Sequence, residues 1–223
     1  MNFTPFAYFG RPSLQANFIG TSFSAASQAA YTFTGVNLES SGLSVITIGN
    51  EISGAVGRTV NSITLNGVTM SQAVQQISGL NSTGVGSAIY YLRQTTTTGT
   101  IVVNFSAAPQ RCLISIYSIT NNLADIPYQT RNNTATSGTG LTNSYTDLEQ
   151  NSVGILHYTV GLDSVTGLAW TNATQRFNFG SGAFGQTRYS GADFLTTTDE
   201  NRIISITHSN STQPLSLVGA VWK

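Results

Sequence analysis

The stretch from Ser87 to Ile119 places the strongest constraint on the fold. It reads SAIYYLRQTTTTGTIVVNFSAAPQRCLISIYSI and holds three short apolar runs, separated by the linkers TTTTG and AAPQ. In the middle run, Ile101, Val103 and Phe105 recur at every second position, which is the period of a β-strand. The linkers contain Gly or Pro and are typical of turns. The stretch therefore predicts the antiparallel centre of a β-sandwich.

The last of these runs, RCLISIYSI, has apolar residues on both faces. Cys112, Ile114 and Ile116 alternate with Leu113 and Tyr117. A strand of this kind is covered on both sides, and we expect a second sheet on one side and a neighbouring subunit on the other. Cys112 is the single cysteine. Its apolar surroundings predict a buried structural thiol.

Further short β-type runs follow one another along the rest of the chain. Gly35 interrupts the alternation of YTFTGVNL and predicts a bulge, and Asn66-Gly67 predicts a tight hairpin. The segment 71–80 (SQAVQQISGL) has helix-like apolar spacing but is short, and it predicts a loop or one or two helical turns. The polar, turn-rich segment 121–151 could be a linker between two domains; we interpret it as a crossover within one domain, because neither half offers enough strands for a sandwich. The expected fold is all-β: one antiparallel, jelly-roll-like sandwich over residues 29–223, preceded by an arm.

The N-terminal segment 1–28 is rich in aromatic residues and is interrupted by prolines. Two roles are open for it: an edge segment that lies on its own domain, or an arm that docks on a partner subunit. The segment lacks the charged and apolar regions of a signal peptide, and no run in the chain is long enough for a transmembrane helix. The candidate docking residues are Phe3, Phe6, Tyr8 and Phe9.

Charged residues make up only 8% of the chain, and the formal net charge is zero. Ordinary soluble domains have about 25%. The basic residues are scattered singly, so the sequence argues against nucleic-acid binding. A surface with so little charge suits lasting contact with other subunits or with sugars.

The residues that could support catalysis are few. His157 and His208 each lie in an apolar β-type run, which predicts buried histidines. The only close carboxylate pairs, Asp147 with Glu149 and Asp199 with Glu200, lie in polar turns, where solvated acids are the ordinary finding. A calcium site formed by Asp147, Glu149 or Asp163 is the alternative, while the spacings of transition-metal sites and phosphate loops are missing. We therefore predict no catalytic residue, cofactor or metal site.

An aromatic set in the C-terminal third has two interpretations. The rings either fill the core or an interface, or they form a platform on which sugar rings stack. Exposed rings would favour sugar binding, and buried rings would favour a structural role. The candidate glycan contacts are Trp170, Phe184 and Tyr189.

The order of the motifs resembles that of a group of β-sandwich proteins from tailed bacteriophages. The motifs are YTFTGVNL, SITLNGVTM, SAIYYLRQTTTTGTIVVNFS, RCLISIYSIT, NSVGILHYTV and LSLVGAVWK. The resemblance covers roughly residues 29–223, and Arg111-Cys112 matches the Arg-Cys pair of the group. It carries no active-site residue with it. At 113–115 the sequence has Leu-Ile-Ser where smaller residues are expected, so packing can differ there.

The resemblance implies a virion protein that is assembled in the host cytoplasm. Head decoration, minor capsid, and tail or fibre proteins are the roles it suggests. Its implied partners are other virion proteins and further copies of the same chain, with a trimer favoured, and it implies neither nucleic-acid nor membrane binding. The alternative from another class is a carbohydrate-binding domain that recognises host glycans.

Overall fold

The computed structural model describes residues 13–223 except residues 55, 81, 163 and 182–186. All regular structure in the described residues is β-strand, and the strands pair in antiparallel fashion. No helix of the described residues is long and apolar enough to span a membrane. The strands are β1 (Gln15–Ser24), β2 (Ala30–Asn37), β3 (Leu43–Ser53), β4 (Val60–Leu65), β5 (Val68–Thr69), β6 (Ser71–Leu80), β7 (Thr83–Arg93), β8 (Thr98–Phe105), β9 (Arg111–Thr120), β10 (Gln129–Ala135), β11 (Gly138–Leu148), β12 (Val153–Val160), β13 (Ala169–Thr171), β14 (Thr174–Gly180), β15 (Arg188–Leu195), β16 (Glu200–Ser211) and β17 (Leu215–Trp222).

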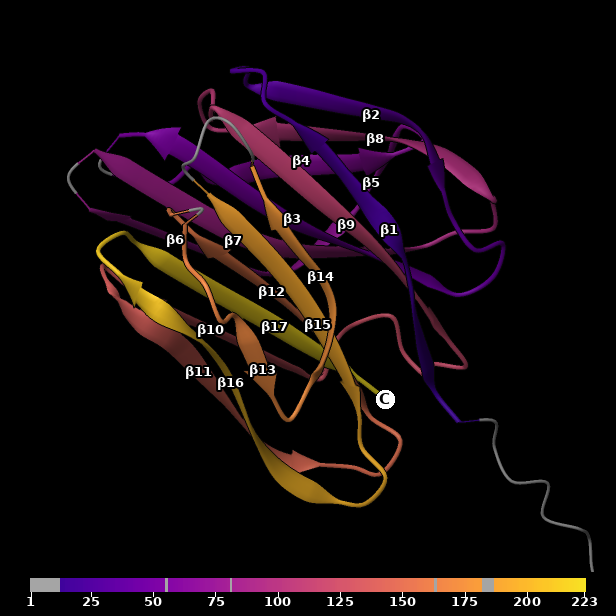
Figure 1. Cartoon of the computed structure of the whole chain (residues 1–223). Helices are drawn as coiled ribbons and strands as arrows, with labels where there is room; N and C mark the ends of the chain where they lie inside the picture. The colour runs from indigo at the N-terminus through magenta and orange to yellow at the C-terminus, as the bar shows by residue number, and fades with distance from the viewer. Residues whose placement is uncertain (1–12, 55, 81, 163, 182–186) are drawn as a thin grey trace, which may run out of the picture.

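The strands form four sheets that divide at the middle of the chain. The inner N-terminal sheet has the order β1-β9-β3-β7-β6, and the outer N-terminal sheet has the order β2-β8-β4-β5. The inner C-terminal sheet has the order β10-β17-β12-β15-β14, and the outer C-terminal sheet has the order β11-β16-β13. We call strands β1–β9 the N-terminal unit and strands β10–β17 the C-terminal unit (Figure 1).

The antiparallel, all-β, sandwich-like fold predicted from the sequence is confirmed. The structure differs from the expected single unit, however, because each half of the chain supplies both sheets of its own sandwich. The polar segment 121–151, expected to be a crossover, instead contains β10 and β11. The polypeptide passes from one unit to the other once, through residues 121–128.

The two units repeat one strand order. If β1, β2, β3 and β4 are matched to β10, β11, β12 and β13, and β6–β9 to β14–β17, the strand orders of the two units agree in both sheets, except that the two-residue strand β5 has no counterpart. Even a bulge recurs, between Phe33 and Val36 in β2 and between Tyr145 and Leu148 in β11. Gly35 and Asp147 hold the bulges, with φ of 64° and 52°. The chain is thus a tandem pair of jelly-roll-like sandwiches.

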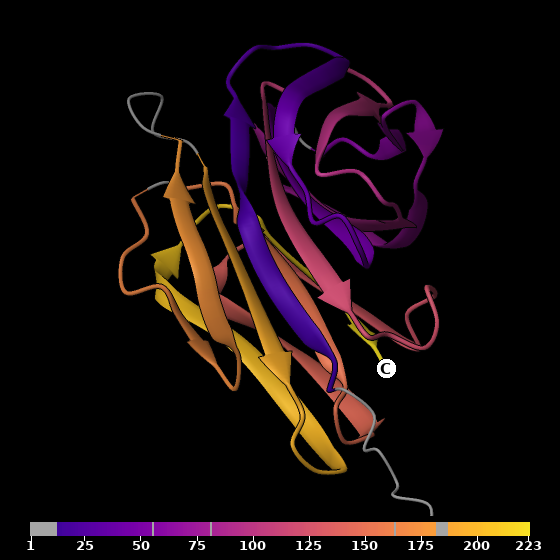
Figure 2. The same cartoon turned by 90° about the vertical axis from the view of Figure 1, so that its right-hand side faces the viewer.

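The inner sheets of the two units pack face to face (Figure 2). Val45 and Ile89 from one sheet lie in a single buried cluster with Ile155 and Trp222 from the other. Polar side chains also cross this interface, as where Ser87 and Thr159 share a hydrogen bond of 2.9 Å between their hydroxyls. The second face of β9, for which a neighbouring subunit was expected, is therefore covered by the chain's own C-terminal unit.

The three runs of Ser87–Ile119 are strands β7, β8 and β9, but they do not form a meander. β8 pairs with β2 and β4 in the outer sheet, whereas β7 and β9 flank β3 in the inner sheet. Successive strands of a jelly roll commonly change sheets. The alternation within each run correctly predicted a strand. The order of the runs along the chain did not predict which strands pair.

Two local predictions have clear outcomes. The Asn66-Gly67 hairpin is confirmed, with φ of 52° and 81° at its two turn residues. The prediction of a loop or helical turns at 71–80 is wrong, because β6 pairs with β7 along this segment. A register shift between Gln72 and Val74 moves the apolar residues out of strict alternation, which explains their helix-like spacing.

Glycine at position 49 allows the two units to approach closely. A Cβ atom there would lie 2.4 Å from the Tyr189 ring and 2.6 Å from His157 Nε2. Replacement of Gly49 by alanine should therefore lower the free energy of unfolding by about 1–3 kcal/mol, measured by chemical denaturation. Gly54→Ala is the control, since its Cβ would have no atom nearer than 3.8 Å. Equal effects of the two substitutions would contradict this account.

Candidate functional site

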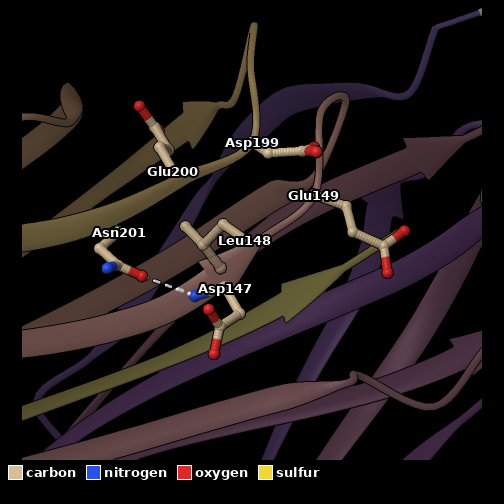
Figure 3. A pocket seen from close by; sticks show the side chains of 6 residues that line it. All are labelled: Asp147, Leu148, Glu149, Asp199, Glu200 and Asn201. Carbon is tan, nitrogen blue, oxygen red and sulfur yellow. Dashed lines mark hydrogen bonds between the residues drawn. The ribbon is translucent and has the colours of Figure 1, made fainter.

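A cavity lined by four acidic side chains lies at one end of the C-terminal unit. It has a volume of about 500 Å³, and the turns β11–β12 and β15–β16 form it (Figure 3). Its lining residues are Asp147, Leu148, Glu149, Asp199, Glu200 and Asn201. The two carboxylate pairs noted in the sequence, about fifty residues apart, thus meet around one cavity.

Local pairing of β11 with β16 brings the two acidic turns together. The β11 bulge turns Asp147, whose backbone N–H donates to Asn201 Oδ1 at 2.7 Å. On the opposite side, Asp199 Oδ1 accepts from the backbone N–H of Gln150 at 2.7 Å. The turns are therefore connected by side chain to backbone hydrogen bonds. The sequence signal was only the spacing of the acids, and their meeting depends on long-range strand pairing.

The carboxylates do not converge on one point. Glu149 pairs with Lys223 and Glu200 pairs with Arg202, each at 2.5 Å. Figure 3 shows the Asp147 and Glu200 carboxylates pointing away from each other. In the described part of the chain, no group of three or more His, Cys, Asp or Glu is arranged to hold a metal ion. Asp163, the third residue of the calcium alternative, lies outside the described residues.

The two histidines are both buried, as predicted, and they lie on opposite faces of the inner C-terminal sheet. His157 faces the N-terminal unit, where its Nδ1 lies 2.6 Å from Thr47 Oγ1. Burial lowers the pKa of His157 to about 3. His208 reaches the opposite face of the sheet, with Nε2 2.6 Å from the Tyr158 hydroxyl, and burial lowers its pKa as well. The two rings therefore cannot act as a pair.

The candidate glycan platform is not assembled from the described residues. Tyr189 is fully buried between the inner sheets, near His157 and Phe179, so its ring offers no face to a sugar. Trp170 is half-buried on the other side of the inner C-terminal sheet, and its indole N–H donates to Ser190 Oγ at 2.9 Å. Phe184 lies outside the described residues. Tyr189 and Trp170 therefore serve the packing of different layers.

Arg111 and Cys112, which match the Arg-Cys pair of the phage group, lie in the buried framework of the fold. Arg111 Nη1 lies 2.6 Å from Glu51 Oε2, directly across β3 and β9, and both side chains are buried. Burial raises the pKa of Glu51, against the opposing effect of Arg111. Cys112 is fully buried, and burial raises the pKa of its thiol, which confirms the prediction of a structural thiol.

Part of the N-terminal arm lies on its own domain. Although prolines interrupt the segment 1–28, residues 15–24 form the regular strand β1, which pairs with β9. Two rings of β1 contact β14: Phe18 stacks on Phe177 with centroids 5.8 Å apart, and Phe23 lies 4.9 Å from Phe179. The candidate docking residues Phe3, Phe6, Tyr8 and Phe9 lie outside the described residues.

Comparison with known proteins returns only distant similarity. No model of a known family and no curated protein matches the sequence. The crystal structure of the PBSX exported protein XepA is similar to 93% of this chain over 86% of its own, with 9% identity and a TM-score of 0.25. The turret protein A223 of Sulfolobus turreted icosahedral virus is similar over 93% and 97% of the two chains, with 15% identity and a TM-score of 0.21. Both scores are below the level at which a shared fold is inferred.

Proposed function

We propose that this chain is a non-enzymatic structural protein on the surface of a tailed bacteriophage particle, where it assembles with other virion proteins and with further copies of itself. The roles that fit are head decoration, minor capsid, and tail or fibre component. The observation that carries the proposal is the tandem pair of jelly-roll-like sandwiches, an architecture used by viral capsid and lectin domains. This support is an analogy between folds.

The placement of the reactive side chains supports a structural role. His157, Cys112 and the Glu51–Arg111 pair are buried between sheets. The open acidic cavity lacks a histidine, and its carboxylates diverge (Figure 3). The phage-type motifs form core strands of both units.

The direct test is a gold-labelled antibody against the protein, applied to purified particles of the phage that encodes it and viewed by electron microscopy. Label spread over the head would support a decoration or minor capsid role. Label on the tail would support a tail or fibre role. If intact particles carried no label and dissolved particles lacked the protein, the proposal would be wrong.

The proposal assigns the aromatic segment Phe3–Phe9 to docking on another virion protein. Deletion of residues 2–12 leaves β1 intact, so we expect an unchanged thermal unfolding temperature but a loss of most incorporation into particles. Mass spectrometry of purified particles measures incorporation against the full chain. A matched variant with Phe3, Phe6, Tyr8 and Phe9 replaced by serine tests whether the rings, rather than chain length, are needed. Normal incorporation of both variants would remove the arm from the proposal.

Glycan recognition is the weaker alternative. The burial of Tyr189 removes one of the three rings on which it depended, and Trp170 is half-buried. Binding of the purified protein to a glycan array, abolished by Trp170→Ala, would revive it.

A further inference from the structure

The repeat of one topology allows a comparison of two equivalent sheet edges within the same chain. In the N-terminal unit, β1 is the edge of the inner sheet and β2 is the edge of the outer sheet. In the C-terminal unit, β10 and β11 hold the same two positions. An edge strand presents unpaired backbone N–H and C=O groups, which form a template for another strand. Whether the backbone groups of this edge are already bonded in each unit therefore indicates where a strand of another chain can pair.

The edge of the C-terminal unit is closed by side chains. Three alternate residues of β10 reach across the sandwich and donate to successive outward carbonyls of β11. The bonds run from Gln129 Nε2 to Thr146 O (2.5 Å), from Arg131 Nε to Ser144 O (2.8 Å) and from Asn133 Nδ2 to Thr142 O (2.8 Å). The carbonyl groups that a new strand would need are thus already bonded, and a charged residue stands on the edge.

The described residues show no such closure at the equivalent edge of the N-terminal unit. Among the described residues, no side chain of β1 donates to a carbonyl of β2; Asn17 instead bonds Glu39 at 3.0 Å. The sequence of β1, QANFIGTSFS, has neither a charged residue nor a proline. These are the residues that usually prevent an edge strand from pairing with another chain. Its pairing with β9 is regular from Gly20 to Ser24. Figure 2 looks onto this side of the molecule, along which β1 runs.

We infer that the β1/β2 edge pairs with the same edge of a second copy of this chain. Because β1 is uncharged, antiparallel pairing with its own copy brings no like charges together. A two-fold axis perpendicular to the inner N-terminal sheet relates β1 to β1 and also β2 to β2 of the second copy, so both open edges are satisfied at once. Closed two-fold pairs are the commonest symmetric assemblies. The inference deepens the self-association that the proposed function includes, and it is tested on the purified protein alone, so its failure is distinguishable from failure of the particle test.

The test is sedimentation velocity of the full chain over a wide concentration range. The wild type should form a concentration-dependent dimer. Thr21→Lys places a charge on the exposed regular part of β1 and should raise the dimer dissociation constant at least about tenfold. Asn132→Lys is the matched control on β10, at an exposed position in the closed edge, and should leave the constant unchanged. A monomeric wild type, or equal effects of both lysines, would overturn the inference.

Two further measurements avoid dependence on a single substitution. Hydrogen exchange on the wild type should show protection of β1 and β2 that increases with protein concentration, while β10 and β11 stay constant. Arg131→Ala combined with Asn133→Ala opens the second edge and should produce assemblies larger than the dimer. Protection of β10 and β11 instead of β1 and β2 would contradict the proposed edge. If deletion of residues 2–12 abolished the dimer while Thr21→Lys left the dissociation constant unchanged, the contact would belong to the N-terminal segment. That result would also overturn the inference.

Discussion

Replacement of Arg111 by methionine should lower the free energy of unfolding by about 3–5 kcal/mol at neutral pH, because it leaves Glu51 as an uncompensated buried charge. Glu51 has no exposed side-chain surface, and its carboxylate lies 2.6 Å from Arg111. Methionine retains most of the apolar stem, so lost packing adds little. Urea unfolding of the purified variant measures the change.

The double variant Glu51→Gln with Arg111→Met isolates the charge. It removes both ions and should recover most of the lost stability, since a neutral pair needs no compensating charge. Arg93→Met is the matched control, because the Arg93–Asp125 pair has the same 2.6 Å distance but side chains that are 46% and 43% exposed. An exposed pair contributes about 1 kcal/mol at most. Equal losses at positions 111 and 93 would contradict the buried-charge account.

The sign of the pH dependence gives a second check on Arg111→Met. Without Arg111, the folded-state pKa of Glu51 should rise further above its ordinary value, because only the hydrogen bond with Thr187 then opposes the effect of burial. A carboxyl with a raised folded-state pKa adds stability below its unfolded pKa, and this is lost as pH rises through the folded pKa. The deficit of Arg111→Met should therefore be smaller in acid and larger above neutrality.

Local alternation in the sequence was enough to predict many of the strands but not their pairing. Ile101, Val103 and Phe105 face one core, and both faces of β9 are covered, as expected. β11 escaped prediction because its polar residues point outward and its bulge at Asp147 breaks the alternation. A period-2 pattern tells which side of a strand is buried. It contains no information on which strand lies beside it.

The division into two units and the acidic cavity depend on such long-range pairing. Residues 121–151 look like a loop because their strands carry threonine, asparagine and glycine, and β10 is stabilised by side-chain hydrogen bonds to β11 rather than by an apolar stripe. The pairs Asp147/Glu149 and Asp199/Glu200 meet only because β11 and β16 are neighbours. One sequence without that pairing offers two separate acidic turns. The same reason hid the repeated topology, which resides in strand order.

Acidification from pH 7 to pH 4 should remove about 3 kcal/mol of stability through His157 alone. The folded-state pKa of this ring is about 3 against an ordinary value of 6.5. Between these two pH values the ring is protonated in the unfolded chain but neutral in the folded chain. Each pH unit between these values costs about 1.4 kcal/mol. The contribution is complete above pH 6.5 and is lost as the pH falls toward 3. The physical cause is burial of the ring between the two inner sheets.

Comparison with His157→Gln isolates this contribution from the other titrating groups. Thr47, Phe177 and Tyr189 surround the ring and do not ionise in this range. Elsewhere, burial raises the pKa of Glu51 and of Asp193, the latter despite its pair with Arg176. These two carboxyls therefore add to the stability of the folded protein as the pH falls. They are common to both proteins, so they cancel in the difference between the two urea-unfolding curves.

His157→Gln should therefore gain about 3 kcal/mol relative to the wild type between pH 7 and pH 4. His208→Gln is the control on the opposite face of the inner C-terminal sheet, where the side chain keeps some exposure and bonds Tyr158. Its relative gain should be smaller. If His157→Gln and the wild type lose stability in parallel, a protonated imidazole must find a partner inside the interface. The burial of His157 between the two inner sheets would then not explain the loss of stability in acid.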